Sequence, residues 1–341
     1  MVAIIQSFDY TIKQKRINSL LLLLTTIALL LLFCSSIQFI RGTVQNNDEQ
    51  NTQKFNFVAA GDFGCGDETN KTIEGMIKKN PKFVIALGDL SYDKSATCWL
   101  NSIIPLDSAG RIKITFGDHD LTKKMFKYND YLAHFNMTKP FYSFNYANVH
   151  FLAMATAKNS IIPYVNGSEQ YNFVRQDLNN AHNNKSIDWI IVYSFRPFYS
   201  SATSHSGQEV LPNTYHPLFD MYGVDIVLQA HSHNYQRTFP LIYNGNSFSS
   251  LYNPIIVDKN RTQYEGSNGS IFLTAGTAGA ELHNFTGKYP YIVEQFASHG
   301  FLNVDINSSE DELKLSGTFY ENDGMQKKDH FSISKNKNPP D

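Results

Sequence analysis

Three Gly-Asp pairs in the first 120 residues could bring carboxylates to one site. They lie in GDFG (61–64), GDLSY (88–92) and GDHD (117–120), so that Asp62, Asp89 and Asp118 are 27 and 29 residues apart. Each pair follows a short apolar run of the β-strand type, and glycine lets a chain turn sharply where a strand ends. Open α/β sheets collect ligands at the carboxyl edge of their strands. Carboxylates that converge there repel one another unless cations neutralise them, so the pattern predicts a metal site.

Two histidines supply nitrogen ligands at the end of another apolar run. In DIVLQAHSH (225–233), His231 and His233 are spaced i, i+2, which would place both imidazoles on one face of a strand. An HxH pair alone is more often a solvated strand end. Together with the three aspartates it forms an oxygen and nitrogen set that suits two transition-metal ions, with one imidazole for each.

The elements that must position these residues are short strands alternating with helices. Apolar runs bounded by turn residues recur along the chain, at 55–60, 82–87, 111–116, 149–155, 188–195, 225–230, 270–275, 301–306 and 313–320. Helical periodicity occurs at 68–81 and 168–182. The early alternation predicts parallel pairing, and the closely spaced later strands predict hairpins. We therefore expect a mixed α/β sandwich. The formal net charge of −2 and the lack of a Lys/Arg-rich run argue against nucleic-acid binding.

The chain divides into four parts by composition. Residues 1–41 contain an apolar run that begins at Leu20 and follows Lys13, Lys15 and Arg16, as in a secretory signal or a membrane anchor, with the bulk of the chain outside the cytoplasm. Residues 42–54 form a polar linker, 55–333 the domain that carries these motifs and 334–341 a polar tail. Cys65 and Cys98 each follow a predicted strand. They could form a disulfide, as suits an exported protein, or remain two free buried thiols.

The motifs together resemble the calcineurin-like metallophosphoesterases and, within them, the purple acid phosphatases. That family's blocks run GDxG, GDxxY, GNH(D/E), VxxH and GHxH, and this chain has GDFG, GDLSY, GDHD, VYSF and AHSH. The resemblance spans roughly residues 55–330, and the tyrosine of GDLSY points to the purple subgroup. It implies a metallophosphoesterase-type β-sandwich of two mixed sheets flanked by helices. It also implies a bare catalytic domain without the extra N-terminal β domain of the larger plant members.

The resemblance assigns a role to each candidate residue. A first metal, usually ferric iron, would be held by Asp62, Asp89, Tyr92 and His233. Asp89 would bridge to a second, divalent Fe, Zn or Mn ion that also takes Asp118 and His231. His119 would contact phosphate and the leaving oxygen, and His205 would face the substrate. Tyr92 could instead be a packed core tyrosine, and His205 a solvated loop residue.

Two positions at the second metal depart from the family pattern. Asp118 stands where the family has asparagine, and Phe195 in VYSF replaces a ligand histidine. Phenylalanine donates nothing, whereas the added carboxylate favours harder ions such as Mn²⁺. We therefore expect a weakened but occupied second site. Ala230 for glycine in AHSH is a milder change.

The implied activity is hydrolysis of small phosphomonoesters by attack of a metal-bound hydroxide, in an exported protein. Two alternatives stay open: a phosphodiesterase, and an inactive descendant that keeps the fold as a binding or scaffold protein. Arg196 and Arg237 could meet phosphate or form ion pairs, and we expect His216 and His283 to be structural.

Overall fold

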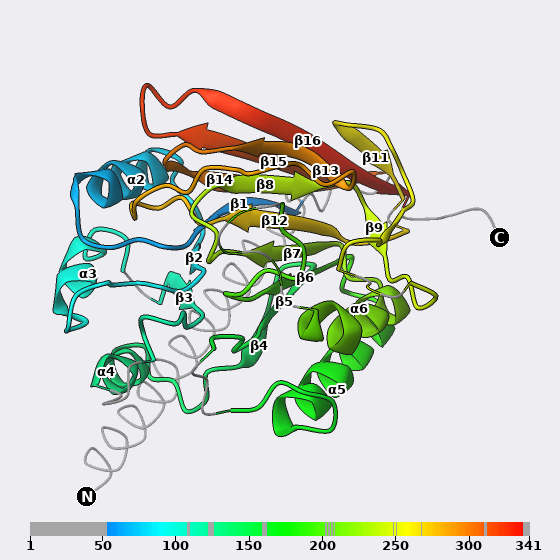
Figure 1. Cartoon of the computed structure of the whole chain (residues 1–341), viewed down its shortest axis with the longest axis horizontal. Helices are drawn as coiled ribbons and strands as arrows, with labels where there is room; N and C mark the ends of the chain where they lie inside the picture. The colour runs from blue at the N-terminus through cyan, green and yellow to red at the C-terminus, as the bar shows by residue number, and fades with distance from the viewer. Residues whose placement is uncertain are drawn as a thin grey trace, which may run out of the picture. The chain divides into compact units, whose positions relative to one another are not determined.

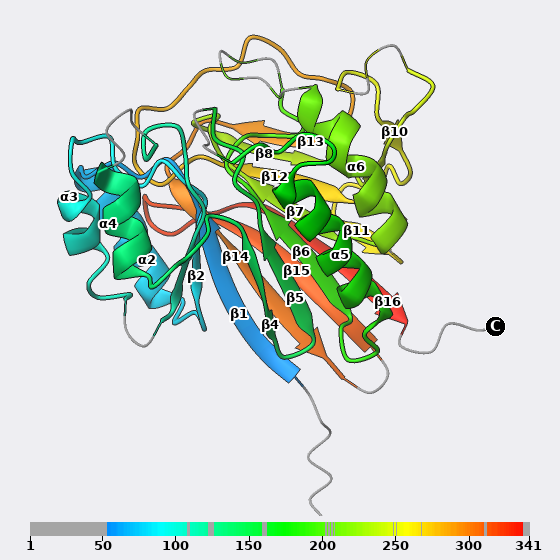
Figure 2. The same cartoon turned by 90° about the horizontal axis from the view of Figure 1, so that it is seen from below.

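Two seven-stranded sheets face one another in the computed structural model of the chain (Figures 1 and 2). The structure describes residues 53–107, 110–121, 126–158, 162–201, 209–247, 251–266, 268–309 and 312–336, together with 203, 205, 207 and 249. The N-terminal signal or anchor, most of the linker and the last five residues of the tail lie outside this described part. Strand β1 begins at Gln53 and β16 ends at Asn336, so the sheets extend slightly beyond both expected domain boundaries.

The first sheet has the strand order β11-β16-β15-β14-β1-β2-β3. Its strands are β1 (Gln53–Ala60), β2 (Val84–Ala86), β3 (Ile112–Ile114), β11 (Gln263–Glu265), β14 (Gly300–Ser308), β15 (Glu312–Glu321) and β16 (Lys327–Asn336). β1, β2 and β3 are parallel and in register, with Ala60 beside Ala86 and Ala86 beside Ile114. β14, β15 and β16 are antiparallel neighbours. Parallel pairing early in the chain and hairpins late are both confirmed.

The second sheet has the order β13-β8-β12-β7-β6-β5-β4, and a two-stranded ribbon pairs β9 with β10. Its strands are β4 (Tyr142–Tyr146), β5 (Val149–Ala153), β6 (Trp189–Tyr193), β7 (Ile226–Gln229), β8 (Tyr235–Thr238), β12 (Ile271–Ala275) and β13 (Ile292–Phe296). The ribbon consists of β9 (Leu241–Ile242) and β10 (Ile255–Ile256). Parallel pairing joins β5, β6, β7 and β12, which gives them a common carboxyl edge.

Five helices flank the sheets in the described part of the chain. They are α2 (Asp67–Lys78), α3 (Thr97–Ser102), α4 (Phe126–His134), α5 (Glu169–Asn183) and α6 (Val210–Tyr222). Helices α5 and α6 cover the outer face of the second sheet, and α2 packs against β14 (Figure 2). None of the helices among the described residues combines the length and hydrophobicity needed to cross a bilayer. The predicted fold class, two mixed sheets flanked by helices, is confirmed.

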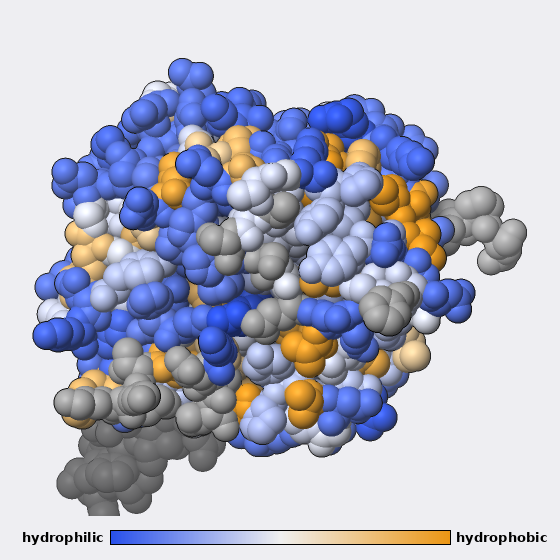
Figure 3. Space-filling model, viewed as in Figure 1, coloured by the Kyte–Doolittle hydropathy of each residue, from blue (hydrophilic) through white to orange (hydrophobic). Residues whose placement is uncertain are grey.

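Apolar side chains fill the space on both faces of the central strands. Along β5, Phe151 packs into the core between the two sheets, while Leu152 packs into a second core with residues of α5 and α6. Strands buried on both faces carry continuous apolar runs, which is why the sequence pattern located them. On the face seen in Figure 3, hydrophilic residues predominate and apolar ones form small, separate areas.

Candidate metal centre

The three Gly-Asp pairs lie just beyond the carboxyl ends of β1, β2 and β3, where these chain segments contact one another. The backbone N–H of Asp62 donates to Gly88 O at 3.0 Å, and Gly61 N donates across to Ala275 O of the second sheet at 2.8 Å. A side chain at Gly117 could not be accommodated, because a Cβ there would lie 2.1 Å from Asp89 Oδ1. The loops are therefore packed directly against the carboxylates that they carry.

The backbone is strained at three of the candidate ligands. Asp62, Asp89 and His231 have φ angles of 56°, 45° and 68°, in the left-handed region that non-glycine residues seldom adopt. Such conformations each cost on the order of 1 kcal/mol or more and occur mainly at functional sites. The positions of the two histidines also differ from our expectation that both lie on one face of a strand. β7 ends at Gln229, so His231 and His233 lie in a turn beyond the strand and not on one strand face.

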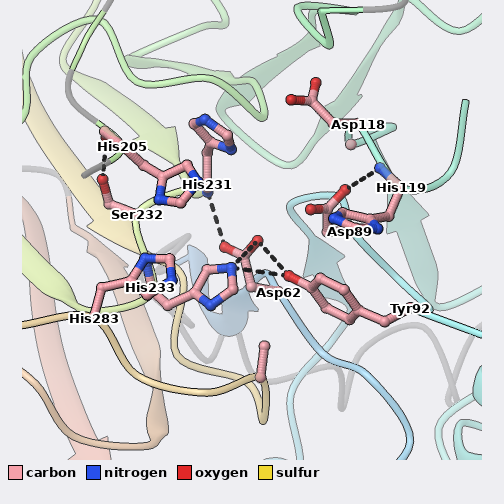
Figure 4. Close-up of polar contacts among 12 residues, drawn as sticks. Asp62, Asp89, Tyr92, Asp118, His119, His205, His231, Ser232, His233 and His283 are labelled. Carbon is pink, nitrogen blue, oxygen red and sulfur yellow. Dashed lines mark hydrogen bonds and ion pairs between the residues drawn. The ribbon is translucent and has the colours of Figure 1, made fainter. Parts of the chain in front are cut away.

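Asp62, Tyr92 and His233 meet at one point (Figure 4). The Tyr92 hydroxyl lies 3.1 Å from Asp62 Oδ1 and 2.9 Å from His233 Nε2, and His233 Nε2 lies 3.3 Å from Asp62 Oδ1. The other carboxylate oxygen, Asp62 Oδ2, accepts the backbone N–H of His231 at 2.8 Å. The loops after β1, β2 and β7 each contribute one of these side chains. Two oxygens and one nitrogen thus lie close to one another.

Neighbouring groups orient this cluster. His233 donates its Nδ1–H to the carbonyl oxygen of Glu281 at 2.7 Å, which directs Nε2 toward Asp62 and Tyr92. A hydrogen bond of this kind on the far ring nitrogen is the usual way in which a ligand histidine is held. Asp89 Oδ1 accepts the backbone N–H of His119 at 2.7 Å.

Excess negative charge is buried at the centre. Burial, followed by the charges of Asp62 and Asp120, raises the pKa of Asp89 well above its usual range. Burial would also raise the pKa of Asp62, but the charge and hydrogen bond of His233 outweigh it, and the net shift is downward. Burial and the two carboxylates raise the pKa of Tyr92, so a phenolate there requires a nearby cation.

These residues fit one metal ion. The carboxylate of Asp62, the phenol of Tyr92 and the imidazole of His233 converge, the imidazole is held by a carbonyl, and the Asp89 carboxylate lines the same cavity; a cation would neutralise the buried charge. Asp62, Asp89, Tyr92 and His233, the set predicted for the first metal, are the residues that would hold it. Their role as ligands stays a prediction.

The second position does not fit in the same way, because the Asp118 carboxylate is turned away from the others (Figure 4). Arg196 Nη2 contacts Asp118 Oδ2, Arg196 Nε donates to Asp118 Oδ1 at 3.3 Å, and the backbone N–H of Lys158 donates to the same Oδ1 at 2.6 Å. The Phe195 ring fills the adjoining space, 5.1 Å from the His231 ring between centroids. The structure therefore does not bring Asp118 to Asp89 and His231 as a ligand set.

A cavity of about 600 Å³ opens over the centre and is lined mainly by polar residues. The predicted catalytic residues His119 and His205 are both on its wall, and the His205 and His231 rings lie 4.6 Å apart. Burial, followed by the charge of Arg196, lowers the pKa of His231 to about 4. Burial likewise lowers the pKa of His119 and of His205. His119, His205 and His231 are thus largely neutral at neutral pH. Burial would also lower the pKa of His233, but the charge and hydrogen bond of Asp62 outweigh it and raise that pKa.

His283 belongs to the same wall, contrary to our expectation that it is structural. Its ring stacks on that of His233 at 4.0 Å and on that of His205 at 4.6 Å, with planes 7° and 8° apart. The stacking joins residues 50 and 78 positions apart, so no local pattern could reveal it. His216 is structural as expected: it is fully buried, and its ring contacts the Tyr199 hydroxyl and the Leu241 carbonyl.

Other candidates have structural partners. Arg237 is 1% exposed and forms a fork with Asp329, with distances of 2.6 Å from Nε and 2.8 Å from Nη2. Cys65 and Cys98 form a disulfide with Cα atoms 6.0 Å apart. With Asp93 they make the one trio of His, Cys, Asp or Glu ligand atoms within 4.8 Å of each other in the described part of the chain, and the disulfide accounts for it.

Known proteins resemble this chain in sequence and in fold. The family model described as calcineurin-like phosphoesterase matches residues 55–235, more than half of the chain. Purple acid phosphatase 21 of Arabidopsis thaliana is 30% identical over 217 residues, which cover 55% of this chain and 46% of that protein. The chain spans about half or less of the length of the curated relatives it matches.

Two solved structures share the fold. The purple acid phosphatase PPD1 from yellow lupin seeds has a TM-score of 0.66 at 21% identity, over 84% of this chain and 55% of that one. GAP50 of Plasmodium, described as the anchor in the inner membrane complex, has a TM-score of 0.59 at 16% identity, over 81% of this chain and 87% of that one. With the matched motifs and the converging ligand set, these findings place the chain in the calcineurin-like phosphoesterase family, with the purple acid phosphatases among its relatives.

Proposed function

We propose that the protein is a metal-dependent hydrolase of phosphomonoesters. The observation that carries this proposal is the meeting of Asp62, Tyr92 and His233 at one point beside the buried Asp89 carboxylate, beneath an open cavity. Membership of the phosphoesterase family supports the class of reaction. A cation bound at this point would supply Lewis acidity, lowering the pKa of water and offsetting the negative charge of the phosphoryl group.

The residues of the cavity wall would bind and orient the substrate. His119 lies on the wall, with its backbone fixed to Asp89 and its ring 4.5 Å from that of Tyr92. From there a protonated ring nitrogen of His119 would donate to the departing alkoxide. Because burial lowers the pKa of His119, this proton is held more often in acidic solution. His205 and His283, as neutral imidazoles, would donate hydrogen bonds to phosphoryl oxygens.

A non-catalytic binding protein is the second candidate. The observations that favour it are Phe195 at a ligand position and the engagement of Asp118 by Arg196. The same fold occurs in GAP50, a protein described as an anchor. Against this candidate, the cluster around Asp62 keeps the geometry of a metal site, which a scaffold would not need.

We also propose that the protein is exported, either secreted or anchored by its N-terminal segment. The Cys65–Cys98 disulfide supports export, because disulfides persist in oxidising compartments and are rare in the cytosol. Fractionation of cells that express the full chain, with protease added outside, tests this: digestion of the domain in intact cells is expected, and full protection would contradict export.

An assay of the full chain with p-nitrophenyl phosphate, after reconstitution with Fe, Mn²⁺ or Zn²⁺, tests the hydrolase. Activity is expected with at least one metal and should fall at least about 100-fold in Asp62→Asn. The exposed Asp93→Asn is the matched control and should keep the parental rate. Bis-p-nitrophenyl phosphate, run in parallel, distinguishes a phosphodiesterase. Metal binding without hydrolysis of either ester would favour the non-catalytic candidate.

A further inference from the structure

Both oxygens of the Asp118 carboxylate are engaged by protein partners. The guanidinium of Arg196 takes both of its oxygens, and the backbone N–H of Lys158 shares one of them. The side chains of Arg196 and Asp118 are only 8% and 18% exposed, so water competes little with the pair. A metal ion could recruit this carboxylate only by breaking a charge-assisted fork, which is among the stronger hydrogen-bonded pairs in proteins.

Arg196 is itself fixed in place. Its backbone N–H donates to Thr156 Oγ1 at 2.9 Å, and its carbonyl accepts from Ser194 Oγ at 3.3 Å. Arg196 follows directly on Phe195 and lies three positions beyond the end of β6. A guanidinium is charged at every physiological pH, so it is a permanent cation beside His231 and Asp118.

The Phe195 ring occupies the remaining space. It is fully buried, packs against the His231 ring, and lies so close to the strand end of β2 that a Cβ added to Gly88 would be 2.7 Å from its Cδ2 atom. A phenyl ring offers no lone pair to a metal. The location between the β2 turn and His231 is therefore filled by an apolar group, with a positive charge next to it.

Purple acid phosphatases use a binuclear metal centre. We propose that this chain instead binds a single metal ion, at Asp62, Asp89, Tyr92 and His233, and that Arg196, held by Asp118 and flanked by Phe195, is the built-in cation in place of the second ion. The changes at 118 and 195 then belong together: the carboxylate at 118 holds the guanidinium, and the phenyl ring closes the space around it. The inference rests on the proposed metal centre, since it concerns how many ions that centre takes.

Counting bound ions tests the inference without an activity assay. The full chain, stripped with chelator, is dialysed to equilibrium against a series of Mn²⁺ concentrations, and bound manganese is measured by mass spectrometry. We expect the count to saturate at one ion per chain. The electron paramagnetic resonance spectrum should be that of isolated Mn²⁺, without the signature of two coupled ions. A second ion, if seen at all, should bind at least 100-fold more weakly.

Three variants separate this account from a simple loss of one ligand. Phe195→His alone should still bind one ion, because the Asp118–Arg196 pair remains. Asp118→Asn combined with Arg196→Met should also bind one, because Phe195 remains. The triple variant, which combines all three changes, should bind two with coupled spectra. Arg175→Met, the loss of an exposed arginine on α5, is the control and should leave the count at one.

The number of bound ions distinguishes failure of the single-ion inference from failure of the proposed function. Two ions in the parent protein, or two in Phe195→His alone, would overturn the inference while leaving the proposed hydrolase intact. No bound ion in the parent would instead remove the metal centre on which the proposed function stands. Circular dichroism and thermal unfolding of every variant confirm that it folds; should the triple variant fail to fold, the counts for the parent and for Phe195→His still decide the question.

Discussion

The ion pair between Asp118 and Arg196 should be measurable in the stability of the metal-free protein. Its two side chains are largely shielded from water, at 18% and 8% exposure, and the guanidinium meets both carboxylate oxygens. Removing one partner of a buried pair typically costs about 3–5 kcal/mol, because the other charge is left uncompensated. Since Asp118 also keeps the Lys158 N–H, we take the lower end and expect about 3 kcal/mol for Arg196→Met.

A double-mutant cycle isolates the pair itself. Asp118→Asn should cost about 1.5 kcal/mol, because the neutral amide oxygen still accepts hydrogen bonds. The double variant should cost about 2 kcal/mol, clearly less than its two single changes added together. The expected coupling energy is therefore about 2.5 kcal/mol, measured by equilibrium urea unfolding followed by circular dichroism in the presence of chelator.

The surface pair Lys139–Glu169 is the matched control. Its Nζ–Oε1 distance is 2.5 Å, but its side chains are 54% and 62% exposed. Exposed pairs of this kind contribute less than about 1 kcal/mol, so the same cycle there should give a coupling near zero. If the cycle at Asp118 and Arg196 gave no more coupling than this control, the pair would not exist in solution and the single-ion inference would lose its basis.

Three further predictions concern the core, the metal and the disulfide. Asp329→Ala should destabilise the fold by about 4 kcal/mol in urea, because it leaves the buried guanidinium of Arg237 without its carboxylate partner. The control Glu294→Ala, at a partly exposed pair with Arg261, should change stability by less than about 1 kcal/mol; equal effects would contradict the assignment of Arg237 as structural. Protein loaded with Fe³⁺ should absorb visible light through a phenolate at Tyr92, and Tyr92→Phe should abolish the band without changing the far-ultraviolet circular dichroism; an unchanged band would remove Tyr92 from the ligand set. Cys98→Ser opens a link across 33 residues and should cost about 3 kcal/mol, so equal melting curves for variant and parent would show that the disulfide does not form.

The parts of the fold that were predictable from the sequence are those with a clear local hydrophobic pattern, either the apolar runs of strands or the helical periodicity of α2 and α5. β5, β6 and β7 are buried along their whole length and mostly apolar, and β1 is buried over its last four residues; the turn residues after these strands mark where side chains leave the sheet. The three Gly-Asp pairs were informative for that reason, since a glycine between a buried strand and an aspartate leaves few other arrangements. Position on the carboxyl edge followed from parallel pairing alone.

The elements that were not predicted depend on partners distant in sequence. β8 (Tyr235–Thr238) is fully buried although its residues carry polar groups. Several of their hydrogen-bond partners lie far away in sequence: Arg237, for example, donates to Asp329, 92 residues away. Helix α6 contains Pro217, which local rules treat as a helix breaker. Arg196 and Asp118 are 78 residues apart, and no periodicity links them. Local patterns locate where chemistry could occur, but pairing among side chains decides which of them remain available for it.

The charges of the residues at the centre also favour a single metal ion. Three aspartates were expected to share two metal ions, yet Arg196 already neutralises Asp118. Asp62, Asp89 and Tyr92 then remain for the first position, with His233 as a neutral nitrogen ligand once a metal displaces its proton. Two carboxylates and a phenolate carry three negative charges, which match one trivalent ion or leave one negative charge beside a divalent ion. A second dication would find no free carboxylate at this position, because the Asp118 charge is already neutralised by Arg196, so the chain's own residues favour one ion on electrostatic grounds as well as geometric ones.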